Sequence, residues 1–329
     1  MTKRNPYAGI VSGGGFGLAP LSEHDFRQIH LATLEVLEKT GLFIESTEAL
    51  DLYSDGGCIV DRATRTVRFP PHVVEDAIAS APESIALYGR GNAAHDVVLE
   101  PGRVGFTNFS EGLRIVDPRN GERRDSTKQD LADIARMADY LSEIDTFGVA
   151  VGAHDAPVRT AAIHNAEAQL LNTTKPVDAG PIDGKDVRDI AAMAAALVGG
   201  EDELRARPIL FMGACPVSPL KIPADACEII IECARAGLAD NILSMAMSGA
   251  SSPVTVAGTL VVHNAEVLAG LVLAQLAERG APVIYGSSTT AMDMRLATAS
   301  VGSPECGIIS ACVAYIAKQY RLPSFVAGA

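Results

Sequence analysis

From about residue 104 onwards, short apolar segments alternate with amphipathic helix patterns, and this alternation constrains the fold more than any other feature. We predict strands at 104–109, 146–152, 176–180, 208–214, 241–247, 282–287 and 323–328. We predict helices between them at 127–141, 157–171, 184–198, 223–236, 255–278 and 304–320. Strand followed by helix, repeated along a chain, is typical of a parallel sheet with right-handed crossovers. The pattern therefore predicts an α/β protein with a (β/α)8 TIM-type barrel, incomplete here because about seven of the eight strands are found.

The residues before this alternation follow a different pattern, and we predict three parts in the chain. Residues 1–20, rich in Gly and Ser, are expected to form a flexible N-terminal arm. Residues 21–103 are expected to form an N-terminal helix and β-hairpin segment. Residues 104–329 then form the incomplete (β/α)8 barrel, with a further hairpin around 113–121.

Capping patterns predict where two helices begin. Ser22 and Asp25 precede a helix that ends near Lys39, and Ser126 and Gln129 precede the first barrel helix. In a capping box the first side chain accepts a hydrogen bond from the backbone three residues later, and the later side chain returns one. We therefore predict capping boxes at both places.

Charge and composition argue against several classes of partner. The net charge is −13 without a run rich in Lys and Arg, which argues against nucleic acid and anionic membrane surfaces. No window holds about 18 uninterrupted apolar residues, so we predict no membrane span. The six cysteines form no C-x-x-C pair. Those in apolar helix patterns are typical of buried free thiols: Cys227, Cys233 and Cys312. We expect a cytoplasmic protein in a reducing compartment.

A four-residue motif, His-Asn-Ala-Glu, occurs at 164–167 and again at 263–266, a separation of 99 residues. Its spacing places His and Glu on one face of a helix. That arrangement suits a metal or an acid–base pair, or else polar packing of a helix against the sheet. Because both copies lie one or two turns into their helices, away from the strand ends, we favour polar packing.

Barrel enzymes place their chemistry at the carboxyl ends of the strands. The catalytic candidates that follow predicted strand ends are Glu111, His154, Asp293, Arg295 and Glu305. The aromatic candidates near the same rim are Phe106, Phe109 and Tyr285. Asp178, which ends the strand at 176–180, is not among the candidates. Acidic residues with an aromatic rim suit a small cationic substrate better than an anionic one. No Cys, His and Asp cluster has the spacing of a zinc site, and we predict no directly bound metal.

Several motifs of the second half resemble one family. They are His-Asn-Ala-Glu-Val-Leu-Ala-Gly at 263–270, Gly-Ala-Pro-Val-Ile-Tyr-Gly-Ser-Ser at 280–288, Asp-Met-Arg at 293–295, Gly-Ser-Pro-Glu at 302–305 and Leu-Pro-Ser-Phe-Val-Ala-Gly at 322–328. With residues 21–69, these motifs resemble the trimethylamine:corrinoid protein methyltransferase family over essentially the whole chain from Leu21. The resemblance implies a (β/α)8 barrel. It also implies methyl transfer from trimethylamine, or a related tertiary or quaternary amine, to the Co(I) centre of a corrinoid protein.

The resemblance also implies partners and roles. The corrinoid (cobalamin) is carried by a separate cognate protein, which must dock over the barrel rim, and the other partner is a small methylated amine. Neighbouring acidic residues would protonate or orient the amine, and aromatic residues would hold the methylammonium. We also expect a homo-oligomer.

The family has two kinds of member. One carries pyrrolysine, encoded by an in-frame amber codon shortly after the Val-Ala-Gly segment. The other lacks it and demethylates substrates such as glycine betaine. Since the sequence ends at Ala329, we expect the front part of a pyrrolysine enzyme whose amber codon was read as a stop. A TAG codon followed by a frame for the last barrel unit would support this expectation, and TAA, TGA or no homologous frame would contradict it.

Other functions stay open at this point. One is a glycine-betaine-type corrinoid methyltransferase without pyrrolysine. Another is a barrel aldolase or lyase, which needs a Schiff-base lysine at a strand end. The lysines here argue against it because they precede strands or lie in loops: Lys175, Lys185 and Lys221. A third is an inactive truncated fragment, since an unclosed barrel exposes two strand edges.

Overall fold

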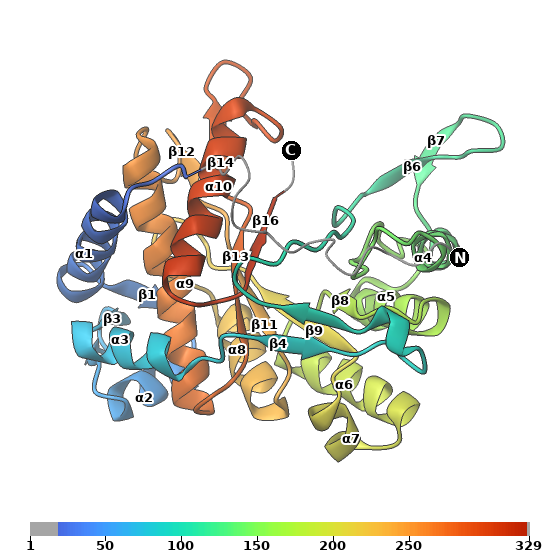
Figure 1. Ribbon diagram of the computed structural model, residues 1–329, viewed down its shortest axis with the longest axis horizontal. Coiled ribbons are helices and arrows are strands. Elements are labelled where there is room, and N and C mark those ends of the chain that lie inside the picture. Colours follow the sequence, from blue (N-terminus) through green and yellow to red (C-terminus); the bar gives the residue numbers. More distant parts are fainter. Residues whose placement is uncertain (1–18, 328–329) are drawn as a thin grey trace. The chain divides into compact units, whose positions relative to one another are not determined.

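The computed structural model describes residues 19–327, which fall into two compact units (Figure 1). The first unit comprises residues 85–213, and the second comprises residues 19–84 together with 214–327. The predicted arm at 1–20 lies outside the described residues except for its last two. The predicted three-part division of the chain stays a prediction.

The first unit contains two antiparallel hairpins and a parallel strand pair with its helices. Its elements are β4 (Ile85–Leu87), η1 (Ala93–His95), β5 (Val97–Leu99), β6 (Arg114–Val116), β7 (Arg123–Asp125), α4 (Lys128–Tyr140), η2 (Val158–Thr160), α5 (Ala161–Asn172), β8 (Val177–Ala179), α6 (Gly184–Val198), α7 (Glu201–Ala206) and β9 (Leu210–Ala214). Strands β4 and β5 pair antiparallel, as do β6 and β7, whereas β8 and β9 pair parallel. The predicted helices of this region and its hairpin are confirmed, and α7 is an additional short helix.

The prediction of regular strands at 104–109 and 146–152 is wrong, because a side chain replaces part of the backbone hydrogen bonding between these two segments. The chain at 106–112 does run beside the chain at 145–152. The Asn108 side chain donates from Nδ2 to Gly148 O (3.2 Å) and accepts from Gly148 N at Oδ1 (2.9 Å). Isolated parallel bridges join Gly112 to Val151 and Phe147 to Val177. The predicted strand order is therefore kept, but an amide side chain replaces part of the backbone ladder.

The capping box of α4 lies one residue later than predicted. Thr127 Oγ1 accepts from Asp130 N (3.3 Å), and the Asp130 carboxylate accepts from Thr127 N (2.8 Å). The predicted pair of Ser126 and Gln129 does not cap the helix, because the Ser126 hydroxyl donates to Gly152 O instead (2.7 Å). The predicted capping box at the start of α1 is confirmed.

Replacing Thr127 by alanine should lower the free energy of unfolding by about 1 kcal/mol, because a backbone N–H at the helix start loses its acceptor. Gln129→Ala is the matched control and should change it by less than about 0.5 kcal/mol, as is usual for surface substitutions. Urea unfolding followed by circular dichroism measures both variants. Equal losses in the two would contradict the observed cap.

The second unit packs small sheets and helices around one long helix. Its elements are α1 (Glu23–Lys39), β1 (Leu42–Ile44), α2 (Thr47–Asp55), β2 (Ile59–Asp61), β3 (Thr66–Arg68), α3 (Pro71–Ser80), β10 (Lys221–Ile222), α8 (Ala224–Ala236), β11 (Asp240–Ser244), β12 (Met247–Ser248), α9 (Val256–Ala277), β13 (Val283–Ser287), β14 (Thr290–Asp293), β15 (Thr298–Ala299), α10 (Pro304–Gln319) and β16 (Ser324–Val326). Strands β11, β13 and β16 pair parallel in chain order. Strands β10, β1, β3 and β2 form a second sheet, and β12, β14 and β15 a third.

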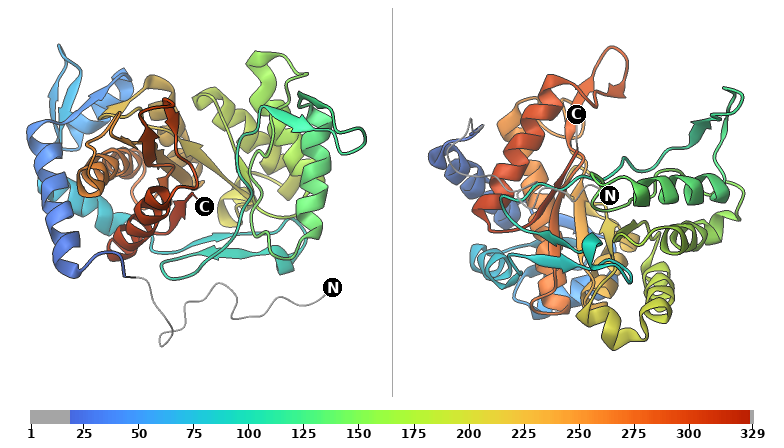
Figure 2. Two further views of the ribbon diagram at one scale, coloured as in Figure 1. Left: turned by 90° about the horizontal axis from the view of Figure 1, so that it is seen from above. Right: turned by 45° about the vertical axis from the view of Figure 1, so that its right-hand side comes forward.

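Helix α9 forms the core of the second unit, and α1, α2, α3, α8 and α10 pack against it. Figure 2 shows α1 (blue), α9 (orange) and α10 (red) from two further sides. A helix that is apolar around its whole circumference is normally buried. By length and composition α9 is able to cross a membrane, but 72% of its most apolar window is buried. A buried core helix passes the same test, so this is weak evidence for a span, and the absence of a membrane partner stays a prediction.

The coarser part of the fold prediction is confirmed: the chain is a mixed α/β protein whose parallel strands are joined by helices. The predicted strands at 176–180, 208–214, 241–247, 282–287 and 323–328 correspond to β8, β9, β11, β13 and β16. The cysteines expected to be buried thiols are buried and free: Cys227, Cys233 and Cys312.

Candidate functional site

The candidate site lies in the first unit, where the chain at 108–112 runs beside the chain at 146–152. A Cβ atom on Gly152 would lie 2.4 Å from Glu111 Oε1 and 3.0 Å from His154 Cε1. Glycine at this position therefore leaves the space in which the carboxylate and the imidazole lie. The structure thus brings together two predicted catalytic residues, Glu111 and His154.

Ser126 fixes the orientation of His154. The buried Ser126 hydroxyl donates its hydrogen to Gly152 O (2.7 Å). Its oxygen then accepts a hydrogen bond from His154 Nδ1 (2.9 Å). In the neutral imidazole the proton is therefore on Nδ1, and Nε2 keeps a lone pair. The Nε2 atom lies 3.4 Å from the position that a Cβ atom on Gly152 would take. Glu111 Oε1 lies 2.4 Å from that same position.

Glu111 and His154 are suited to proton transfer. Burial raises the pKa of Glu111 above its ordinary value, and the nearby His154 opposes part of that shift. A carboxyl group with a raised pKa holds its proton closer to neutral pH. Beside an imidazole nitrogen with a free lone pair, it forms a pair that can donate and accept a proton.

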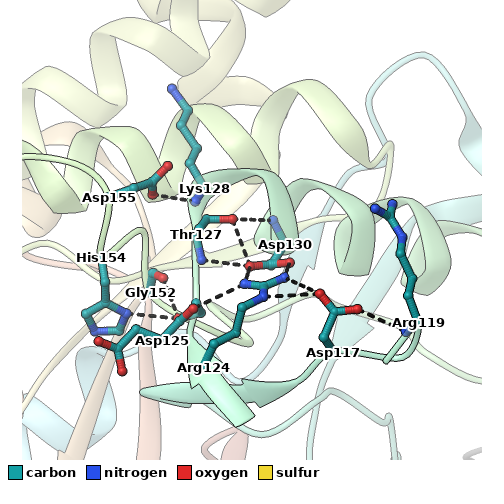
Figure 3. Close-up of polar contacts among 11 residues, drawn as sticks. Asp117, Arg119, Arg124, Asp125, Thr127, Lys128, Asp130, Gly152, His154 and Asp155 are labelled. Carbon is teal, nitrogen blue, oxygen red and sulfur yellow. Dashed lines mark hydrogen bonds and ion pairs between the residues drawn. The ribbon is translucent and has the colours of Figure 1, made fainter. Parts of the chain in front are cut away.

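Arg124 ties the β6–β7 hairpin to the start of α4 (Figure 3). Its guanidinium binds both carboxylate oxygens of Asp130 (2.7 and 2.8 Å) and one of Asp117 (3.2 Å). The hydrogen bonds from Arg124 are the largest reason that the pKa of Asp130 lies well below its usual range. The Asp155 carboxylate accepts from Lys128 N (2.7 Å), which joins the next loop to the same helix. These contacts hold the backbone on both sides of the candidate site.

The segment 147–152 alternates between two faces, as an extended chain does. The residues that face the apolar core are Phe147, Val149 and Val151. The residues between them are small: Gly148, Ala150 and Gly152. Ala150 also packs against that core, so Gly148 and Gly152 make the small-residue face. Polar side chains of neighbouring segments lie over this small-residue face.

Asp178 lies on the same small-residue face, although its sequence position did not mark it as a site residue. It is the middle residue of β8, between the buried Val177 and Ala179, so it points to the opposite side of the strand. A Cβ atom on Gly148 would lie 3.8 Å from Asp178 Oδ2 and 2.4 Å from Ser110 Oγ. Burial raises the pKa of Asp178 to about 7. The sequence feature that could have identified Asp178 is a single carboxylate inside an otherwise apolar strand.

Phe106 and Phe109, predicted to bind substrate, precede Glu111 and are exposed by 57% and 76%. The backbone of Phe106 is held in place because its N–H donates to Asp145 Oδ2 (2.8 Å). Because both rings are exposed, they can contact a ligand. Their role in substrate binding stays a prediction.

Tyr285, also predicted to bind substrate, lies in the core of the second unit. Its side chain is fully buried, its hydroxyl donates to Asn264 Oδ1 (2.7 Å), and its ring packs against His263 and Tyr320. Asn264 Nδ2 donates in turn to Thr33 Oγ1 (3.0 Å) and Tyr320 OH (2.8 Å). In the structure Tyr285 therefore joins β13 to α9, and its role in substrate binding stays a prediction.

The other predicted catalytic residues of the second unit lie in a turn and at a helix start. The Asp293 carboxylate accepts from Arg295 N (2.8 Å) and Leu296 N (3.1 Å) between β14 and β15. The Arg295 side chain is exposed. Glu305 is exposed in the first turn of α10, where the helix dipole favours a carboxylate. The structure assigns these residues local roles, and their catalytic roles stay predictions.

The repeated His-Asn-Ala-Glu motif takes part in polar packing. In α9 the buried Glu266 accepts from Ser218 Oγ (2.8 Å), Ser244 Oγ (2.6 Å) and Leu220 N (2.9 Å). In α5 the corresponding Glu167 is more exposed and pairs with a lysine of α4. Within residues 19–327, no group of three or more His, Cys, Asp and Glu side chains could hold a metal ion.

Comparison with known proteins identifies the family. The model of the trimethylamine methyltransferase family (MTTB) matches residues 8–329. The chain belongs to the trimethylamine methyltransferase family. Within it, the trimethylamine methyltransferase MttB of Desulfitobacterium hafniense (strain DSM 10664 / DCB-2) is 51% identical over 321 residues, which are 98% of this chain and 64% of that protein. MttB of Methanosarcina thermophila is 42% identical over 332 residues, covering 100% of this chain and 69% of that protein.

Two more distant matches are a second methyltransferase sequence and a solved structure. A glycine betaine methyltransferase of Desulfitobacterium hafniense (strain Y51) is 32% identical over 306 residues, covering 92% of this chain and 63% of that protein. The crystal structure of the Methanosarcina barkeri monomethylamine methyltransferase MtmB matches with a TM-score of 0.54 and 15% identity, covering 92% of this chain and 67% of that chain. This likeness shows a shared fold. The chain spans about two-thirds of the length of its curated relatives (64% and 69% of the two MttB proteins).

Proposed function

We propose that the protein transfers a methyl group from trimethylamine to the Co(I) centre of a corrinoid held by a separate protein. The observation that carries the proposal is the family match over residues 8–329, with 51% identity to a protein named trimethylamine methyltransferase. The corrinoid acceptor and its carrier rest on the motif resemblance described above. The glycine betaine methyltransferase is less similar, at 32% identity, which favours trimethylamine as the donor.

In this reaction, the cobalt electron pair forms the bond to the methyl carbon, and the electrons of the carbon–nitrogen bond go to nitrogen. The dimethylamide anion is a poor leaving group, so the nitrogen must carry a proton when the bond breaks and leave as neutral dimethylamine. We assign this proton handling to Glu111 and His154, whose geometry suits it. The exposed rings of Phe106 and Phe109 offer faces for a methylammonium cation.

The complete (β/α)8 barrel is also part of the proposal. It is supported by the parallel strands of each unit, joined by helices in the predicted order, and by the fold shared with MtmB. A cytoplasmic location and a homo-oligomeric state are proposed with it, on the sequence expectations alone.

The test is a methyl-transfer assay with purified protein and a corrinoid protein reduced to Co(I). With trimethylamine we expect formation of methyl-Co(III), seen in the visible spectrum, and of one dimethylamine per methyl group. Glycine betaine is the comparison donor. Transfer from glycine betaine alone would favour the second candidate function, and transfer from neither donor would contradict the proposal.

A further inference from the structure

The Asp178 carboxylate is a charge without a counter-charge in the part of the chain that the structure describes. No residue between 19 and 327 is seen to donate a hydrogen bond to its carboxylate oxygens or to form an ion pair with them. Its backbone oxygen, in contrast, accepts from Gln169 Nε2 (2.9 Å). The Asp178 side chain is half-buried, and even a partial loss of water disfavours a carboxylate unless a cation or hydrogen-bond donors offset it. The position of Asp178 is therefore one that a bound cation would stabilise.

The nearest polar side chains do not supply that counter-charge. Asn108 uses its amide hydrogens on Phe109 O (2.8 Å) and Gly148 O (3.2 Å). Ser110 Oγ lies close to the Gly148 position, and a hydroxyl is neutral. Burial alone accounts for the pKa of Asp178 rising to about 7, with no contribution from a neighbouring charge.

The surroundings of Asp178 are built largely from small and apolar residues. The neighbouring chain presents the small-residue face of Gly148 and Gly152. Across the β8–β9 pair, the register partner of Asp178 is Phe211, and register partners lie on the same face of a sheet. Small residues, an apolar ring and one carboxylate together match a small alkylammonium ion better than an anion.

We propose that Asp178 binds the protonated nitrogen of trimethylamine and thereby selects a tertiary ammonium over a substrate that carries its own carboxylate. Trimethylammonium has one N–H, which can donate a charge-assisted hydrogen bond to the carboxylate and so orient the three methyl groups. When a methyl group leaves for Co(I), the carbon–nitrogen electron pair stays on nitrogen with its proton. This leaves neutral dimethylamine, which the Glu111–His154 pair can protonate for release, and Asp178 remains a carboxylate. Glycine betaine has no N–H, and its own carboxylate would be repelled.

The test compares Asp178→Asn with Asp183→Asn. Asparagine keeps the shape of either side chain and removes one negative charge. Asp183 begins α6 by accepting from Asp186 N (2.9 Å), and asparagine caps helices equally well, so this control should fold normally. Calorimetric titration with trimethylammonium chloride measures binding directly, the methyl-transfer assay gives KM, and thermal unfolding verifies that both variants fold.

This inference rests on the proposed function, but the experiment can contradict either one without contradicting the other. We expect Asp178→Asn to weaken trimethylammonium binding and raise KM by about 10- to 100-fold, as expected for one charge-assisted hydrogen bond, with Asp183→Asn close to the unmodified protein. Glycine betaine binding should not weaken in Asp178→Asn. Equal trimethylammonium affinity in the Asp178 variant and the unmodified protein, or no binding by the latter, would overturn the inference. Asp178-dependent binding without methyl transfer would uphold it and contradict the proposed function instead.

Discussion

Replacing Asn264 by leucine should lower the free energy of unfolding by about 2–4 kcal/mol, because three hydrogen bonds are lost and the buried Tyr285 hydroxyl is left without a partner. Asn264 is fully buried and joins three elements. Its Oδ1 accepts from Tyr285 OH (2.7 Å), and its Nδ2 donates to Thr33 Oγ1 (3.0 Å) and Tyr320 OH (2.8 Å). Leucine has a similar size, so the loss comes mainly from the hydrogen bonds rather than from a cavity.

The internal repeat supplies a matched control for this experiment. Asn165 occupies the same place in the first copy of the motif and is also buried, but its side chain accepts one backbone hydrogen bond, from Ala153 N (2.9 Å). Asn165→Leu should therefore lose about 1–2 kcal/mol. Urea unfolding followed by circular dichroism measures both. A loss for Asn264→Leu no larger than that of the control would show that the cluster around Tyr285 contributes little to stability.

A double-mutant cycle separates the cluster from general packing. In a Tyr285→Phe, Tyr320→Phe background, two of the hydroxyls that Asn264 serves are absent. The additional loss caused by Asn264→Leu should then shrink by at least about 1 kcal/mol, because residues of one hydrogen-bond network are not additive. An unchanged loss would mean that Asn264 acts through its shape alone.

Replacing Glu111 by glutamine should lower kcat for methyl transfer by about 100-fold, with a smaller change in KM, because general acid–base groups typically contribute a factor of about 10² to 10⁴. Glutamine keeps the shape of Glu111 and cannot release or take up a proton. The measurement is the rate of methyl-Co(III) formation at saturating trimethylamine. Glu122→Gln, on the exposed turn of the β6–β7 hairpin, is the control and should keep full activity.

Gly152→Ala tests the same carboxylate without changing it. The added methyl group would lie 2.4 Å from Glu111 Oε1, so the carboxylate end must move away from His154. Because that end is flexible, we expect near-normal stability together with a drop in kcat of about tenfold, as for a misplaced catalytic group. Full activity in both Glu111→Gln and Gly152→Ala would remove Glu111 and its geometry from the mechanism.

The course of the chain through the fold was largely predictable. Parallel strands β8, β9, β11, β13 and β16 lie where apolar segments were predicted, and the helices between them follow the predicted pattern. The exceptions at 104–109 and 146–152 have a physical cause. Asn108 pairs with both the N–H and the carbonyl of Gly148 through its side chain, and such pairing leaves no trace in a hydrophobic pattern.

The candidate site was predictable only in part. Glu111 and His154 could be named because both follow apolar segments, but their closeness depends on Gly152, whose missing side chain leaves the space. The same rule named Tyr285, which the structure buries against α9. Position along a strand does not say which of its two faces a side chain occupies, and for Tyr285 that face is the core.

By itself, the sequence determined the α/β class, the order of the strands and helices, and the family, because periodicity and motifs are local properties of the chain. Only the tertiary structure decided which polar side chains lie close together. It joined Glu111 to His154 across Gly152, and it left the Asp178 carboxylate on the small-residue face without a partner among the described residues. The physical reason is that burial and hydrogen-bond satisfaction depend on neighbours distant in sequence, which become neighbours only when the segments pack together.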